Sequence, residues 1–148
     1  MLDKCEGTML YLKAGDTVTL YDLCVGMMLA SGNDCANAVA FTLSGSLKAF
    51  ADLMNSTASK LSMNNTHFIT PSGLDEDKPY SCAYDMALFA MSFMQNETLA
   101  EIISEKSFSG NGADGQFADD PEVITQDYNW VSHNYLVTDN EYQYAYAT

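Results

Sequence analysis

Apolar residues recur at spacings of three and four along much of the chain and predict a series of helices. The capping-box pattern TLYD predicts a helix that starts after Thr19 and runs to Ala30. A second helix is expected to start at Asn33 or Asp34, whose short polar side chains suit an N-cap, and to stop at the Ser-Gly pair 44–45.

Three further helices follow from the same periodicity. The third begins at Ser46 and places six apolar residues on one face: Leu47, Phe50, Ala51, Met54, Ala58 and Leu61. Residues 64–80 are rich in Asn, Pro, Gly and Asp and are expected to form a loop. Ser81 is expected to cap a fourth helix that reaches Phe93, and Asn96 a short fifth one.

The remaining segments favour strands or loop. Residues 8–20 alternate apolar and polar positions on either side of 14–16 and predict a short hairpin. Residues 109–122 read as an acidic Gly-rich loop, and the tyrosines of 141–148 recur at period two, as in a strand. The pattern therefore predicts one domain over 1–148, mostly α, with short strands at the ends.

Charge narrows the range of partners. The chain carries 20 acidic residues against 6 basic ones, a net charge of −14, so nucleic acid and anionic membrane surfaces are not expected to bind. The longest apolar run, 20–30, is about half of what a membrane span needs and contains Asp22. The first residues, MLDKCEG, lack the apolar stretch of a signal peptide.

Cysteine and histidine chemistry predicts no metal or cofactor. The four cysteines have no CxxC spacing and are interpreted as small buried apolar residues, with a disulfide as the minority alternative: Cys5, Cys24, Cys35 and Cys82. His67 and His133 have no cysteine pair at ligand spacing to complete a zinc site, and His67 is interpreted as structural.

The sequence LASGNDCANA sets a polar corner, Ser31-Gly32-Asn33, between the first two predicted helices. Glycine permits the sharp bend, and the corner presents a hydroxyl and a carboxamide close together. For an isolated Ser-Gly-Asn, helix capping is a sufficient explanation. The sequence around it favours a different one.

The run TVTLYDLCVGMMLASGNDCANAVA resembles the segment around the second active-site motif of serine-type D-alanyl-D-alanine carboxypeptidases, the low-molecular-weight penicillin-binding proteins. The resemblance continues, in order, through FADLMN, LSMNNTHFITPSGLD, YSCAYDMALFA, EKSF and HNYL. It implies the helical region of the β-lactamase/transpeptidase-like α/β fold, with most of the five-stranded antiparallel sheet missing from this chain.

The resemblance also implies a reaction and the residues that serve it. These enzymes use the motifs S-x-x-K, S-x-N and K-T-G, of which Ser31-Gly32-Asn33 matches the second. Ser31 is then a catalytic proton relay, Asn33 both catalytic and substrate-binding, and Asn134 of HNYL a supporting substrate contact. The implied substrate is a peptidoglycan stem peptide ending in D-Ala-D-Ala, β-lactams acylate the same nucleophilic serine, and the expected location is extracytoplasmic.

Two of the three motifs are not found in the 148 residues. Lys60 follows Thr57 rather than a serine at the S-x-x-K spacing, and no K-T-G occurs. We therefore expect an excised or truncated fragment that is inactive alone and whose exposed faces favour an oligomer or strand exchange. The alternative is a catalytically silent cell-wall-binding or interaction module on the same scaffold.

Overall fold

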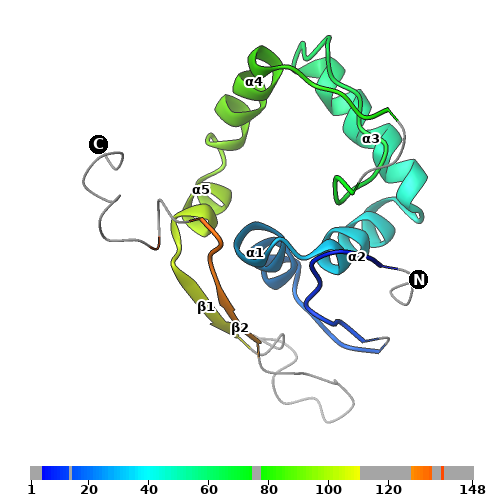
Figure 1. Ribbon diagram of the computed structural model, residues 1–148. Helices are drawn as coiled ribbons and strands as arrows, with labels where there is room; N and C mark the ends of the chain where they lie inside the picture. Colours follow the sequence, from blue (N-terminus) through cyan, green and yellow to red (C-terminus); the bar gives the residue numbers. More distant parts are fainter. Residues whose placement is uncertain (1–4, 14, 75–77, 111–127, 135–137, 139–148) are drawn as a thin grey trace.

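The computed structural model describes residues 5–13, 15–74, 78–110, 128–134 and 138. The described part contains five helices and one two-stranded antiparallel sheet, which confirms the mostly α prediction (Figure 1). The elements are α1 Leu20–Ala30, α2 Asn33–Ser44, α3 Leu47–Lys60, α4 Ala83–Phe93, α5 Glu97–Ser104, β1 Ser107–Gly110 and β2 Tyr128–Val131.

Local capping chemistry sets most of the helix ends as predicted. The side-chain oxygens of Thr19, Ser46 and Asn96 each accept the N–H of the residue three positions later, at 3.0–3.1 Å. Gly45 ends α2 in the left-handed conformation, with φ 72°, which glycine adopts without steric cost. Each cap satisfies backbone groups that have no partner within the helix itself.

Two predicted caps are wrong. Gly32 is the N-cap of α2 and has no side chain that could accept a capping hydrogen bond. The side chains of Asn33 and Asp34 instead bind the segment before α1. Cys82, not Ser81, is the N-cap of α4, and it too makes no capping hydrogen bond with its side chain. Both helices nevertheless begin within two residues of the predicted position.

The hairpin predicted over residues 8–20 is wrong for the described residues, which form a turn without strands. The turn is closed by the Asp16 N–H, which donates to the Lys13 carbonyl at 3.1 Å, and by the Lys13 N–H, which donates to the Asp16 carboxylate at 2.8 Å. The N–H groups that a hairpin would use are bound elsewhere, as the site shows below.

The strand pair lies where none was predicted. β1 and β2 pair antiparallel, with Ser107 opposite Val131 and Gly110 opposite Tyr128. Ser109 and Gly110 therefore belong to β1 and not to the expected loop, whereas the rest of that loop, 111–122, lies outside the described residues. The strand predicted for 141–148 also lies outside them.

The hydrophobic core joins α1 to its neighbours α2 and α5 and to the sheet (Figure 1). Its members are buried apolar side chains from these elements and, with Leu12, from the segment before α1: Leu12, Leu23, Val25, Leu29, Ala30, Cys35, Val39, Ile102, Tyr128 and Trp130. Burying one such large side chain contributes roughly 1.5–3 kcal/mol. The end of α1 and the start of α2 are thus anchored by the best-packed part of the molecule.

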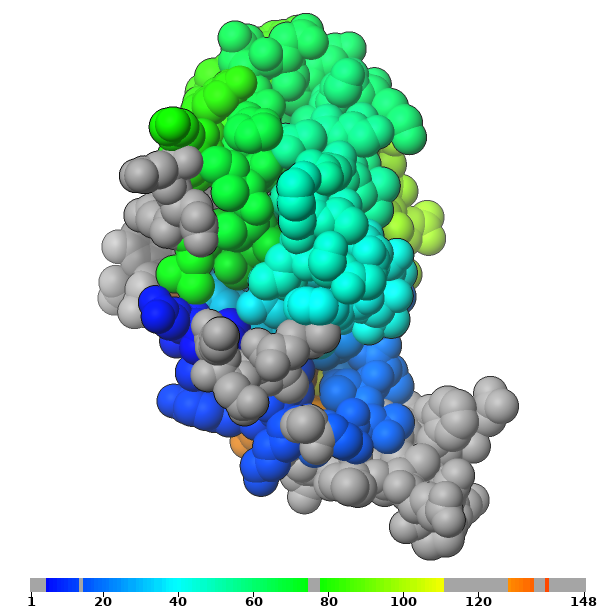
Figure 2. All heavy atoms as spheres, turned by 90° about the vertical axis from the view of Figure 1, so that its right-hand side faces the viewer, coloured from blue at the N-terminus to red at the C-terminus, as the bar shows by residue number. Residues whose placement is uncertain are grey.

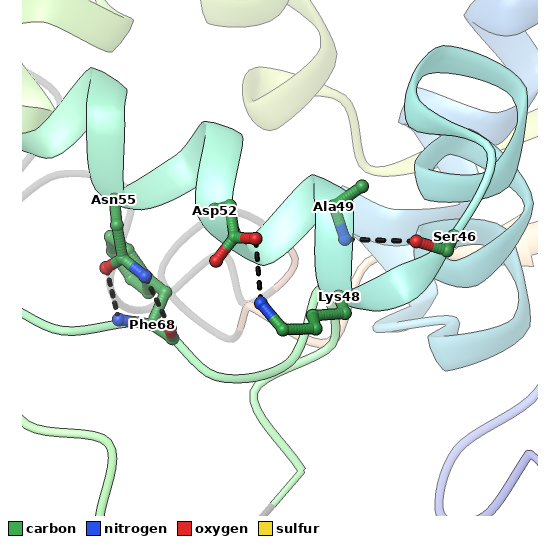
Figure 3. A network of polar contacts seen from close by, with 6 residues as sticks. All are labelled: Ser46, Lys48, Ala49, Asp52, Asn55 and Phe68. Atoms are coloured by element: carbon green, nitrogen blue, oxygen red, sulfur yellow. Dashed lines mark hydrogen bonds and ion pairs between the residues drawn. The ribbon is translucent and has the colours of Figure 1, made fainter.

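The loop that joins α3 to α4 is tied down at two points. The Asn55 side chain donates to the Phe68 carbonyl at 2.7 Å and accepts the Phe68 N–H at 2.8 Å, replacing a backbone pair (Figure 3). Asp85, buried in α4, accepts the Asn65 N–H at 2.7 Å and the Thr66 hydroxyl at 2.8 Å. These contacts confirm a defined loop over this region.

α4 is apolar but poorly covered within the described part of the chain. Asp85 is its only buried residue, while Met91 is 60% exposed and Met94, just after the helix, 54%. Two apolar cavities of about 340 and 300 Å³ adjoin it, and both include Met86 and Phe89 among their walls. Among the described helices, none has the length and apolar character needed to cross a bilayer.

Candidate functional site

The corner between α1 and α2 holds Ser31 in an unusual backbone conformation. Ser31 has φ 57° and ψ 40°, the left-handed region that usually takes glycine at the end of a helix. For a residue with a Cβ this conformation costs roughly 1–2 kcal/mol. The turn is closed by the Gly32 N–H, which donates to the Gly26 carbonyl at 3.1 Å.

The Ser31 side chain does not cap a helix. The residue is exposed, and its hydroxyl makes no hydrogen bond within the described part of the chain. Gly32, and not Ser31, is the buried residue of the corner, and it faces the Leu10 side chain. A donor and acceptor group therefore stands free at the end of a rigid helix.

Asn33 is half-buried and held by the N-terminal segment, residues 6–12. Its side-chain Nδ2 donates to the Glu6 carbonyl at 2.7 Å, and its backbone N–H donates to the Thr8 carbonyl at 2.9 Å. The amide has a second N–H and a carbonyl oxygen that make no hydrogen bond among the described residues. Asn33 can thus contact a further group while its orientation stays fixed.

Asp34, which sequence reasoning treated as a possible N-cap, is the most heavily bonded residue of the corner. It is 2% exposed and accepts the N–H of Leu10 on both carboxylate oxygens at 3.0 Å, and that of Leu12 at 3.0 Å. The Cys35 N–H adds a bond of 3.1 Å. A carboxylate this buried normally needs such donors to offset its desolvation.

Asn134 lies just beyond β2, in a stretch attached to the end of α1. The His133 N–H donates to the Leu29 carbonyl at 3.0 Å, and the Asn134 N–H donates to the Ser132 hydroxyl at 3.2 Å. Asn134 is exposed. The structure therefore brings the three predicted site residues to one end of α1, although about a hundred residues separate Asn33 from Asn134.

Three cavities among the described residues lie away from this corner. Those beside α4 are described above, and a third, of about 420 Å³, opens between α1 and α5. Neither Ser31 nor Asn33 lines any of these three.

All four cysteines have free thiols in this structure, but only Cys35 is buried, whereas Cys5, Cys24 and Cys82 are half-buried, so the interpretation as buried apolar residues holds for Cys35 alone. Burial raises the pKa of the Cys35 thiol to about 12, with the Asp34 carboxylate as the next cause. Burial also raises the pKa values of Cys5 and Cys24. Thiols that stay protonated at neutral pH are poor nucleophiles, so these three do not supply the missing nucleophile.

Two other polar residues, His67 and Asp22, lie outside the corner. His67 pairs through its backbone with Tyr80, in both directions at 2.8 and 3.2 Å, which fits the structural interpretation. Asp22 is 1% exposed, and its carboxylate has no hydrogen-bond partner among the residues that the structure describes. No cluster of three metal-binding side chains occurs among the residues that the structure describes.

The family model described as D-alanyl-D-alanine carboxypeptidase matches residues 1–145. The carboxypeptidase DacA of Escherichia coli is 42% identical over 106 residues, covering 71% of this chain and 26% of the relative. DacF of Bacillus subtilis is 38% identical over 95 residues, covering 64% of this chain and 24% of the relative. The chain thus spans about a quarter of the length of these curated relatives.

Solved structures show the same relationship in three dimensions. The carboxypeptidase DacD from Francisella tularensis superposes with a TM-score of 0.78 at 27% identity, covering 95% of this chain and 43% of that one. Penicillin binding protein 6B from Escherichia coli gives 0.73 at 33% identity, covering 90% and 38%. This agreement confirms the fold class inferred from the sequence.

Proposed function

The chain belongs to the D-alanyl-D-alanine carboxypeptidase family, and from this premise we propose that it supplies one wall of a serine carboxypeptidase active site. The reaction is removal of the terminal D-Ala from a peptidoglycan stem peptide through an acyl-enzyme. One observation carries the proposal: Ser31 holds a free hydroxyl in a costly left-handed conformation, two residues from the oriented amide of Asn33.

Ser31 acts as a proton relay in this proposal. The attacking serine is weak until a neighbouring base takes its proton, and in this family's S-x-x-K motif a lysine stands close enough to do so. A hydroxyl that both donates and accepts can pass a proton from that lysine to the departing amine of D-Ala. Backbone strain of the kind seen at Ser31 is typical of functional sites.

Asn33 and Asn134 orient the substrate. The second N–H of Asn33 is available to a peptide carbonyl, while its bond to Glu6 fixes the plane of the amide. Asn134 stands at the same end of α1 because the preceding residue is bonded to Leu29. Both contacts favour an extended peptide lying across the corner.

The nucleophile and the K-T-G strand come from outside the 148 residues in this proposal. No S-x-x-K or K-T-G occurs in the chain, which covers only about half or less of the related solved structures. The apolar cavities beside α4 support the same view, since an apolar segment that carries the nucleophile would cover side chains such as Met86 and Phe89. Residues 1–148 are then a partial domain, and the chain alone is inactive.

Partners and location follow from the same proposal. The binding partners are stem peptides ending in D-Ala-D-Ala and, in the longer protein, β-lactams that imitate them. Such a substrate places the enzyme outside the cytoplasm, at the cell envelope. The isolated chain self-associates through its uncovered apolar residues on α4, whose burial between copies is favourable.

The direct test uses the extended protein, meaning this chain with enough neighbouring coding sequence to restore S-x-x-K and K-T-G. Incubated with a peptide ending in D-Ala-D-Ala, it is expected to release free D-alanine, and the 148-residue chain to release none. If no such motifs flank the chain, or the extended protein binds peptidoglycan without releasing D-alanine, the silent binding module is correct instead.

A further inference from the structure

We propose that Asp34 is a positioning residue, which holds the N-terminal segment across the corner and thereby fixes Ser31 and Asn33. This inference rests on the proposed function, because the geometry that it protects is that of the site. Asp34 itself touches neither substrate nor nucleophile in this proposal.

The first observation is how completely the Asp34 carboxylate is used. Both oxygens are occupied by N–H groups, two from the N-terminal segment and one from the first turn of α2. The segment thus lies against α2 through hydrogen bonds to a charged acceptor, which are roughly twice as strong as those between neutral groups. The N-terminus of α2 also favours a negative charge at this position.

The second observation is that the same segment holds Asn33. The carbonyls of Glu6 and Thr8 accept the two Asn33 N–H groups described above. Between them, Gly7 has φ 80°, and a Cβ built there would stand 2.6 Å from Asn33 Nδ2. Only glycine lets the segment approach the amide this closely.

The third observation is an apolar contact between the N-terminal segment and the corner. The Leu10 side chain packs against Gly26 and Gly32, where an added Cβ would stand 2.6 and 3.1 Å from Leu10 Cδ1. Leu10 is also the residue whose N–H both Asp34 oxygens accept. The carboxylate therefore sets the depth at which Leu10 presses on the corner backbone.

These contacts explain why the effect reaches Ser31. The Ser31 hydroxyl has no bond of its own within the described part of the chain, so its place depends on the backbone of the two residues that follow it. Gly32 is held by Leu10, and Asn33 by residues 6–8. The space-filling view in Figure 2 shows the dark-blue N-terminal segment beside the green loop. A Cβ built at Gly7 would lie 3.5 Å from Leu74 Cδ2 of that loop.

The test compares two buried carboxylates in the extended protein. Asp34→Asn keeps the shape but presents an NH₂ group to the N–H donors of Leu10 and Leu12. Asp85→Asn is the matched control, since Asp85 is equally buried and accepts a backbone N–H and a hydroxyl in the α3–α4 loop. Acylation by a fluorescent penicillin is measured at equal concentrations of folded protein.

A positioning role predicts that Asp34→Asn slows acylation by about 10²-fold relative to Asp85→Asn, because a misplacement of about 1 Å costs that much. Equal rates in the two variants would overturn the inference and leave the proposed function intact. An unlabelled wild-type extended protein would instead overturn the proposed function.

A second pair of variants covers the case in which Asp34→Asn does not fold. Gly7→Ala leaves Asp34 in place but pushes against Asn33, whereas Gly45→Ala has a similar positive φ and open space around its Cβ. We expect Gly7→Ala to slow acylation at least tenfold more than Gly45→Ala. Equal slowing by the two alanines would mean that the contact with Asn33 has no part in the reaction.

Discussion

The backbone N–H of His133 donates a hydrogen bond to the carbonyl of Leu29 at 3.0 Å. Leu29 lies two residues before Ser31, and His133 directly precedes Asn134. This bond brings a segment from the far end of the described chain to the end of α1. The candidate site is therefore assembled by the core and the sheet together, and not by the corner alone.

Replacing Ser31 by glycine is expected to affect the acylation reaction without destabilising the fold. Glycine removes the steric cost of the left-handed conformation, which offsets its greater flexibility in the unfolded chain. We expect the free energy of unfolding to stay unchanged or to rise by up to about 1 kcal/mol, while the extended protein loses acylation. Urea denaturation measures the first, and a marked loss of stability would show that the Ser31 side chain holds the fold.

Asp85 makes the fold sensitive to acid. Burial acts to raise the pKa of this carboxyl, but hydrogen bonds from Thr66, Asn65 and Cys82 together outweigh it and hold the pKa below the ordinary value of 3.8. A carboxylate with a lowered pKa in the folded state stabilises the protein above the ordinary pKa, and this contribution is lost as the pH falls through the lowered value.

The test is urea denaturation from about pH 2.5 to about pH 6, a range that brackets the titration of a carboxyl group. The free energy of unfolding is expected to fall below about pH 4. In Asp85→Asn that acid-dependent fall is expected to be smaller, because the residue no longer titrates. The same fall in the variant and in the wild type would assign the acid sensitivity to other carboxyl groups.

Cys35 is expected to resist alkylation in the folded protein. Its thiol is buried and its pKa is raised to about 12, so very little thiolate exists at pH 8, about the usual pH of alkylation. Iodoacetamide should modify Cys35 only after the protein is unfolded in urea, when all four cysteines should react. Peptide mass spectrometry detects the modified residues. A pair of cysteines that reacts only after reduction would show a disulfide.

The isolated chain is expected to self-associate through α4 and the residue that follows it. Sedimentation velocity should find species larger than a monomer, and replacing Met91 and Met94 together by lysine should shift them toward monomer. Leu43→Lys, at a residue that is 59% exposed on α2, is the control and should leave the distribution unchanged. A monodisperse wild-type monomer would contradict this prediction.

The sequence predicted those features that depend on neighbouring residues. Helix ends at Thr19, Ser46 and Asn96 were found because each cap is a bond across three residues. The corner at Ser31 was recognised as a candidate site because the sequence around it, and several later segments of the chain, resemble the same enzyme family.

What the sequence did not predict depends on contacts between distant segments. Asp34 suited an N-cap locally, but it binds Leu10 and Leu12 instead, and the hairpin predicted there cannot form when those N–H groups are used. The connection between β1 and β2 contains the turn-forming pairs Asn111-Gly112 and Asp114-Gly115, but it is much longer than the about two to five residues of an ordinary hairpin loop. The alternation of buried Tyr128 and Trp130 with exposed neighbours was a further signal that could have revealed β2.

The most direct test of the account is the rate at which a fluorescent penicillin acylates the extended protein with and without the Ser31 hydroxyl. Ser59→Ala, which removes an exposed hydroxyl from α3, is the matched control and should react like the wild type. Loss of a proton relay typically costs about 10²–10⁴-fold, so Ser31→Ala should be slower by at least about 10²-fold. Equal rates for Ser31→Ala and Ser59→Ala would contradict the claim that this corner handles the proton.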